Sequence, residues 1–263
     1  ELMIAMMLGL IVIGGALSIY ISTIKSSSDV VKSARLNYDL DSVMQLMVND
    51  IRRAGYWGGA VAGSDATNNN FTQVPTVATA TDIQIRNVAA PTTAVSEGNC
   101  ILYTYDADGN GVDEDPSNLG FDLAGDAITV VNTNEYYGFR LNGAVLEMRI
   151  TGTSATAGSC GVNAEWNNII DENKVNITTL TFSKNNSQCL NVSESNAVYV
   201  GAGVPLDSSC PAGATAGFSV AGDSLVETRQ IDITLIADVV GDDTMSKSLI
   251  GIVKVRNNRI FTQ

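Results

Sequence analysis

The chain has 263 residues, of which 28 are acidic, 15 are basic and none is histidine, giving a net charge of −13. This length accommodates one domain with an appendage. The excess of acids disfavours nucleic acid as a partner, because binding to phosphate backbones requires clustered Lys and Arg. The absence of histidine excludes Ser-His-Asp and Cys-His nucleophile activation and histidine-ligated zinc. The P-loop, dinucleotide-binding and nucleophile-elbow motifs are also missing from the sequence, so we expect no enzymatic activity.

An apolar segment opens the chain and runs from Leu2 to Ile24 without a charge, between Glu1 and Lys25. As an α-helix it would be about 34 Å long, enough to cross a hydrocarbon core of about 30 Å. A secretory signal peptide would have a basic region before a shorter apolar stretch and a small-residue cleavage site after it. We therefore expect residues 1–25 to stay in the mature chain as a transmembrane helix.

Four residues of this segment stand out as candidates for contacts with other chains. A carboxylate beside a long apolar run is costly unless something neutralises it, which makes Glu1 a candidate for a charge-paired contact. Gly9, Gly14 and Gly15 each lower helix propensity by about 1 kcal/mol in water, yet they permit close approach of another helix in apolar surroundings. These glycines are predicted to be contact points or weak points of the helix.

The helix is predicted to continue in water, because neither proline nor glycine occurs between Lys25 and Gly55. Residues 26–54 carry one apolar stripe at the helical period, which we expect to pack on a sheet. The stripe consists of Leu36, Leu40, Val43, Met47, Ile51 and Ala54. Gly55 is a typical stop signal.

Residues 55–263 read as an antiparallel β domain with long loops, since short runs rich in Val, Ile, Thr and Tyr recur. The predicted strands are Ile83 to Val88, Cys100 to Tyr105, Ala127 to Val131, Tyr136 to Leu141, Val145 to Ile150, Val175 to Phe182, Glu227 to Ala237 and Ser246 to Arg256. Asn142-Gly143 favours a two-residue hairpin turn. The fold class is therefore α+β, a ladle whose long N-terminal helix packs on an antiparallel sheet.

Charged side chains in these strands are interpreted as solvated. Arg140, with Glu147 or Arg149, is expected on a solvent-facing side of the sheet. A basic C-terminal stretch is likewise expected on one solvated sheet face, or facing acids of a neighbouring subunit. It contains Lys247, Lys254, Arg256 and Arg259.

The chain has four cysteines, an even number in a chain with a membrane segment, which predicts two disulfides. Four cysteines allow three pairings. We favour Cys189 with Cys210, which closes a Ser-, Asn- and Gly-rich loop, and Cys100 with Cys160, which staples the middle of the domain.

An acidic loop starting at Asp106 fits the opening of a D-x-[DN]-x-[DN]-G calcium loop. Its candidate ligands are Asp106, Asp108, Asn110, Val112 through its carbonyl, and Glu114 or Asp115. An EF-hand would need a bidentate Glu where this chain has Ser117, so a helix-loop-helix site is excluded. A structural calcium ion and a plain acidic loop are both compatible with the pattern.

Several motifs together resemble one family. They are the apolar start ELMIAMMLGLIVIGG, DIRRAGYWG at Asp50 to Gly58, CILYTYDADGNG at Cys100 to Gly111, GFRLNG at Gly138 to Gly143, VNITTLTF at Val175 to Phe182 and the terminal VKVRNNRI. This set resembles type IV pilins, most closely PilW-type minor pilins, which are related to the J-type pseudopilins. The resemblance implies a prepilin that is cleaved and methylated, held in the inner membrane and then assembled into a helical filament. It also implies that Glu1 meets the N-terminal amine of a neighbouring subunit, and that residues 1–25 form the filament core.

The predicted function is that of a structural subunit of a type IV pilus-like filament, which polymerises through its apolar helix and displays a β domain at the surface. Its expected partners are copies of itself or other pilins, and it is expected in the inner membrane before assembly and in an extracellular filament at the bacterial surface afterwards. One alternative is a pseudopilin of a type II secretion system. Another is a membrane-anchored, calcium-dependent binding or adhesion module that acts as a monomer.

Overall fold

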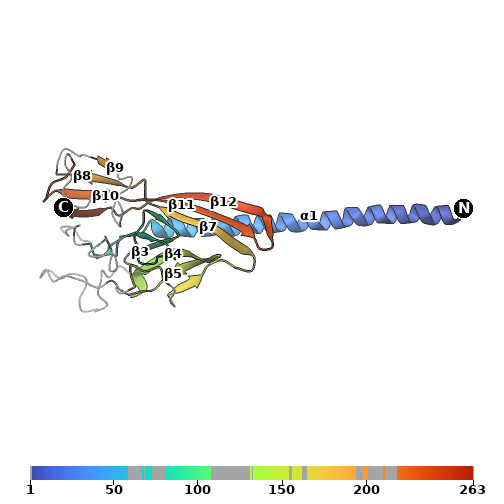
Figure 1. Ribbon diagram of the computed structural model, residues 1–263, viewed down its shortest axis with the longest axis horizontal. Helices are drawn as coiled ribbons and strands as arrows, with labels where there is room; N and C mark the ends of the chain where they lie inside the picture. The colour runs from blue at the N-terminus through green and yellow to red at the C-terminus, as the bar shows by residue number, and fades with distance from the viewer. Residues whose placement is uncertain are drawn as a thin grey trace.

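A single long helix and three antiparallel sheets make up the fold (Figure 1). The computed structural model describes residues 2–58, 67, 69–72, 81–107, 131, 133–153, 156–161, 165–193, 198–200, 210 and 218–262. Helix α1 spans Leu2–Ile51 and is about 75 Å long at 1.5 Å per residue. Its N-terminal half projects away from the β domain as a free handle (Figure 1).

The end of α1 lies a little earlier than predicted, because the chain leaves the helix at Ile51 and forms turns up to Gly55. Gly55 has a φ of 72°, a conformation that side chains with a Cβ rarely adopt. Its N–H donates to the carbonyl of Thr104 at 2.8 Å. The glycine therefore turns the chain off the helix and onto the neighbouring strand.

Two sheets pack against one face of the C-terminal half of α1, and its other face is exposed. One has five strands in the order β1-β3-β4-β5-β6, namely Gln84–Arg86, Cys100–Thr104, Tyr136–Asn142, Val145–Arg149 and Trp166–Asn168. The other has the order β12-β11-β7-β2, namely Asp242–Lys254, Gln230–Val239, Val175–Ser183 and Glu97–Gly98. A third sheet, which we call the distal sheet, lies at the end of the molecule away from the N-terminus (Figure 1). Its order β13-β10-β8-β9 comprises Arg259–Thr262, Ser224–Thr228, Gln188–Asn191 and Val198–Val200.

The helix stripe and the inner faces of the first two sheets form one hydrophobic core. All six stripe residues are buried in it, and Met44 joins them. Strand β11 alternates strictly between buried and half-buried residues, the pattern expected when one face of a strand packs on a helix. The α+β fold class predicted from the sequence is confirmed.

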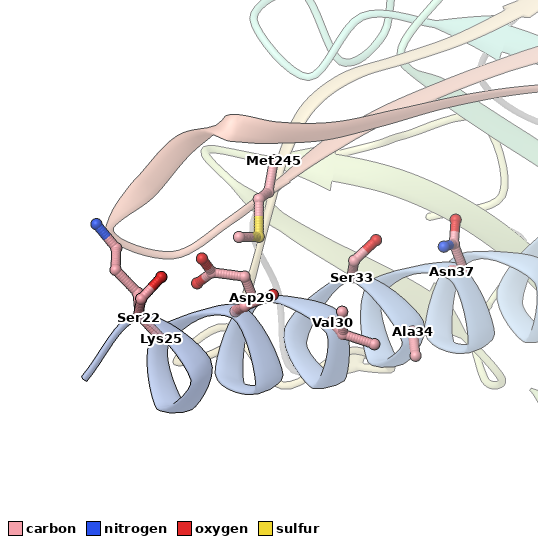
Figure 2. Close-up of a pocket in the computed structure, with 9 residues that line it drawn as sticks. Ser22, Lys25, Asp29, Val30, Ser33, Ala34, Asn37 and Met245 are labelled. Atoms are coloured by element: carbon pink, nitrogen blue, oxygen red, sulfur yellow. The ribbon is translucent and has the colours of Figure 1, made fainter. Parts of the chain in front are cut away.

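The β11–β12 hairpin reaches along α1 towards the N-terminus beyond the point where the apolar stripe begins (Figure 1). Near the middle of the domain the two elements touch closely, since a Cβ added to Gly251 would lie 2.5 Å from the Met44 sulfur. Nearer the N-terminus, polar helix residues face the hairpin and an open groove of about 740 Å³ separates the two (Figure 2). Its lining residues are Ser22, Lys25, Ser26, Asp29, Val30, Ser33, Ala34, Asn37 and Met245.

Some predicted strands differ from the observed ones. The predicted strand Glu227 to Ala237 is split at Arg229, where the chain passes from β10 in the distal sheet to β11 under the helix. Strands β2, β6, β8, β9 and β13 were not predicted, because they have two to four residues and too little alternation to recognise. Of the predicted strand from Ala127, only Val131 lies among the described residues.

Candidate functional site: the exposed helix and its anchor

The apolar half of α1 has no cover within the described part of the chain. Every side chain from Met3 to Ser28 is exposed, and the large apolar ones from Met3 to Ile24 are 52% to 87% exposed. Apolar surface is stabilised by about 25 cal/mol for each Å² removed from water, so this segment requires lipid or other helices around it. The helix is long and apolar enough to cross a membrane.

The predicted assembly residues fall on this surface or at its end. Glu1 lies outside the described residues. Gly9, Gly14 and Gly15 lie inside α1, and a Cβ added to any of them would meet nothing within 4 Å. The glycines therefore leave three places on the exposed helix where a second helix could approach closely.

Asp50 anchors the other end of α1 to the five-stranded sheet. Its side chain is buried and accepts hydrogen bonds from the hydroxyls of Tyr103 at 2.5 Å and Tyr105 at 3.0 Å. Arg53 donates to it at 2.5 Å and lies 4.4 Å over the Tyr105 ring, which stacks on Tyr137 at 4.1 Å. Burial, followed by the charge of Asp50, raises the pKa of Tyr103 well above its ordinary value, so this phenol stays a donor.

Asp50 is the first residue of the DIRRAGYWG motif, but the sequence alone did not predict its role as an anchor. The available signal was its position, directly before Ile51 of the buried stripe and therefore close to the sheet. A charge beside a buried stripe predicts a partner on the opposing element, because a buried carboxylate without one is costly.

A second anchor joins the end of α1 to the C-terminal segment. Asn257 donates through its side-chain amide to the carbonyl of Ala54 at 3.2 Å, in the turns that follow the helix. The guanidinium of Arg229 forms an ion pair with Asp82 and a hydrogen bond with the carbonyl of Asn257, and both charged side chains are buried. The start of β1, the passage from β10 to β11 and the C-terminal segment therefore converge on the helix end.

The outer face of the five-stranded sheet corrects the expectation that Arg140 and Arg149 are solvated. Arg140 is 1% exposed, pairs with Glu147 at 2.5 Å and lies 4.3 Å over the Trp166 ring. Arg149 is fully buried and pairs with Glu165 at 3.0 Å. Both are covered by the segment that follows β5, which strand periodicity cannot reveal.

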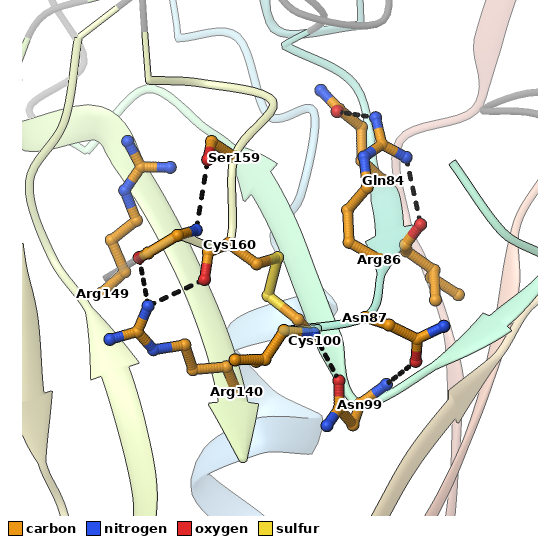
Figure 3. Close-up of a disulfide and its surroundings, with 12 residues drawn as sticks. Gln84, Arg86, Asn87, Asn99, Cys100, Arg140, Arg149, Ser159 and Cys160 are labelled. Atoms are coloured by element: carbon orange, nitrogen blue, oxygen red, sulfur yellow. Dashed lines mark hydrogen bonds between the residues drawn. A yellow bond between two sulfur atoms is a disulfide. The ribbon is translucent and has the colours of Figure 1, made fainter. Parts of the chain in front are cut away.

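One disulfide holds this covering segment in place (Figure 3). It joins Cys100 of β3 to Cys160, and beside it Arg140 donates to the carbonyls of Cys160 at 2.8 Å and of Gly161. The second disulfide joins Cys189 of β8 to Cys210, next to buried Phe218. Both pairs are those favoured from the sequence.

The basic C-terminal residues do not share one environment. Lys254 and Arg256 are exposed and Lys247 is half-buried. Arg259 departs from the solvated face predicted for it, since it contacts buried Glu227 at 3.4 Å. Within this basic C-terminal stretch, the exposed positive charges are therefore those of Lys254 and Arg256.

The predicted calcium loop is described only at its first residue. Asp106 is buried, and its carboxylate accepts the N–H of Gly58 at 2.8 Å while its own N–H donates to the carbonyl of Tyr56 at 2.9 Å. The other candidates, Asp108, Asn110, Val112, Glu114 and Asp115, lie outside the described residues. Within the described ranges no three acidic or cysteine side chains gather as a metal site. The calcium ligand set stays a prediction.

Together, the free apolar helix, the buried stripe and the disulfide-linked β domain define a pilin-like architecture. The family model of prepilin peptidase-dependent protein B matches residues 29–255, well over half of the chain. The chain belongs to this family and is a pilin- or pseudopilin-like subunit. No curated protein and no solved structure matches it.

Proposed function

We propose that this chain is a structural subunit of a type IV pilus-like filament, of the PilW-type minor pilin kind, and not an enzyme. The observation that carries the proposal is the apolar handle, whose large apolar side chains from Met3 to Ile24 are all exposed. In the inner membrane, lipid covers this surface. In the filament, the handles of neighbouring subunits cover one another.

Assembly then follows from the chemistry of the handle. Transferring the charged carboxylate of Glu1 from the membrane into a bundle of helices is costly unless a partner neutralises it. The N-terminal amine of a neighbouring subunit would be that partner. Such a pair penalises axial misplacement more than it stabilises the assembled state. The open faces at Gly9, Gly14 and Gly15 let neighbouring helices approach at short distance.

The test replaces Glu1 by Ala in cells and measures the chain in sheared surface filaments by mass spectrometry. Asp39→Asn is the matched control, because Asp39 lies on the same helix and forms an ion pair with Arg35 at 4.0 Å at the surface. We expect wild-type levels in the membrane for both variants and loss of Glu1→Ala from the filament fraction. Recovery of Glu1→Ala in that fraction at the control level would refute the assembly role of Glu1.

The family match fits a secretion pseudopilin as well as a pilus subunit, and the same preparation separates the two. Presence in sheared extracellular filaments at a few copies supports the minor pilin and dominance there a main pilus subunit, whereas confinement to the envelope supports a type II secretion pseudopilus. A calcium-dependent adhesion module acting as a monomer would instead survive Glu1→Ala with its function intact.

Calcium in the loop after Asp106 is a separate part of the proposal. Closely spaced acids repel one another without a cation, so a bound ion would stabilise the loop. We expect a chelator to lower the melting temperature of the full chain and added calcium to restore it. An unchanged melting curve, with no calcium in the purified chain, would reduce this segment to an acidic loop.

A further inference from the structure

The groove between α1 and the β11–β12 hairpin is a feature that neither the anchor nor the assembly surface explains. One wall is helical and the other is the overhanging hairpin, from which Met245 points towards the helix (Figure 2). Met245 is half-buried and packs at the edge of the hydrophobic core. The groove is the open space between the hairpin and the helix residues that line it.

The composition of the helical wall changes where the groove begins. Leu36 and Leu40 face the sheet as part of the buried stripe. Towards the N-terminus the corresponding positions are Ser33, Asp29 and Ser26, at the same helical spacing. An apolar stripe would have closed the hairpin onto the helix, whereas this polar one keeps the groove open and supplies hydrogen-bonding groups.

The groove lies at the depth of lipid headgroups when the subunit is held in a membrane, and this step rests on the proposed function. The uncharged segment ends at Ile24. A bilayer has a hydrocarbon core of about 30 Å within a total of about 40–45 Å, which leaves roughly 5–8 Å for the headgroups on each side. At 1.5 Å per residue, this layer corresponds to Lys25 through Asp29.

Opposite charges face the groove within this layer. Lys25 and Asp29 lie one helical turn apart, and no ion pair joins them among the ion pairs of the described ranges. Ser22 and Ser26 line the same groove as the lysine. Asp242 at the hairpin turn is not among the lining residues; its pKa is lowered by a hydrogen bond from Thr244 and by the charges of Lys32 and Lys25.

We propose that this groove binds the headgroup of an aminophospholipid of the phosphatidylethanolamine type while the subunit is held in the membrane. The phosphate contacts Lys25 and the hydroxyl of Ser26, and the primary ammonium donates to Asp29. A choline headgroup cannot donate hydrogen bonds to the carboxylate, and a glycerol headgroup lacks the positive charge. The arrangement of a cation and an anion one turn apart therefore favours the ethanolamine headgroup over both.

The test inserts the full chain into nanodiscs that contain equal amounts of phosphatidylethanolamine, phosphatidylcholine and phosphatidylglycerol. Native mass spectrometry then measures which lipid stays bound after release. We expect phosphatidylethanolamine to be retained over phosphatidylcholine by roughly fivefold or more, because only its ammonium donates hydrogen bonds to the Asp29 carboxylate. Equal retention of the three lipids, or equal retention of phosphatidylglycerol and phosphatidylethanolamine, overturns the proposal.

Three variants locate the effect. Asp29→Asn should remove the preference for ethanolamine over choline, and Lys25→Gln should reduce retention of every phosphate-bearing lipid. Asp41→Asn is the matched control, because Asp41 is exposed on the same helix and does not line the groove. All three positions project from a helix surface, so folding is checked by circular dichroism and is expected to be unchanged.

The outcomes also separate this inference from the proposed function. A chain that does not insert into the nanodiscs contradicts storage in the membrane and with it the proposed function. A chain that inserts without lipid selectivity, or whose selectivity is the same in Asp29→Asn as in Asp41→Asn, contradicts only the headgroup site.

Discussion

Replacing Asp50 by Ala tests whether the end of α1 is held to the sheet by its buried carboxylate. The change leaves the hydroxyls of Tyr103 and Tyr105 without their charged acceptor, and each such bond is worth about 1.5–3 kcal/mol. We expect the free energy of unfolding to fall by about 3–5 kcal/mol, the usual cost of removing one partner from a buried charged group. The bond from Arg53 adds little, because that side chain is 57% exposed.

The assay is urea unfolding of the full chain in detergent micelles, with both disulfides oxidised and tryptophan fluorescence as the signal. In a domain of this size the loss corresponds to a melting temperature lower by roughly 10 °C. Asp39→Asn is the control and should change stability by less than about 1 kcal/mol, since its pair with Arg35 is at the surface.

A double-mutant cycle between Asp50→Ala and Tyr103→Phe then isolates their interaction. Residues that share a hydrogen bond are not additive, and we expect a coupling of about 1 kcal/mol or more. If Asp50→Ala costs no more than Asp39→Asn, or if the two changes add without coupling, the carboxylate is not the anchor of the helix end.

Three further predictions concern the close packing, the disulfides and the buried phenols. Gly251→Ala places a Cβ against the Met44 sulfur, so we expect a loss of about 1–3 kcal/mol in urea unfolding, and Met44→Ala in the same chain should make the combined loss smaller than the sum. Replacing Cys100 and Cys160 by Ala should cost about 4 kcal/mol against about 3 kcal/mol for the second, shorter disulfide loop, and equal losses would contradict the loop-entropy argument. Burial raises the pKa of Tyr136 to about 12, above its unfolded value of about 10, so the stability it contributes is complete below pH 10 and is lost as the pH rises to 12. Unfolding and ultraviolet absorbance followed together should show its phenolate forming late, and titration of every tyrosine near pH 10 in the folded chain would contradict this.

The parts of the fold that could be predicted from the sequence are those that local patterns determine. The stripe from Leu36 to Ala54 could be predicted to be buried because its apolar residues recur at the helical period and so share one face of the helix. This prediction does not require knowing which element covers that face. A two-residue turn joins β4 and β5 as predicted, but one residue later than expected: Asn142 pairs with Val145, and the turn residues are Gly143, with a φ of 66°, and Ala144. Each of these depends on neighbouring residues only.

The parts that could not be predicted depend on segments far away in the chain. Arg140 and Arg149 look like surface residues in their strands, and they become buried because the segment after β5 folds back over them. The split at Arg229 depends on Asp82, nearly 150 residues earlier in the chain. The groove beside Asp29 exists because the β11–β12 hairpin is long enough to reach this part of the helix. The alternation of apolar and polar residues in the two strands does not determine where the hairpin ends.

The uninterrupted course of α1 has a mechanical consequence. The exposed handle continues without a break into the half that packs on the sheets, since α1 is one helix from Leu2 to Ile51. A rigid rod of about 75 Å converts a tilt of 10° at one end into a displacement of about 13 Å at the other. A small change in the tilt of the handle among its neighbours therefore produces a much larger displacement of the β domain.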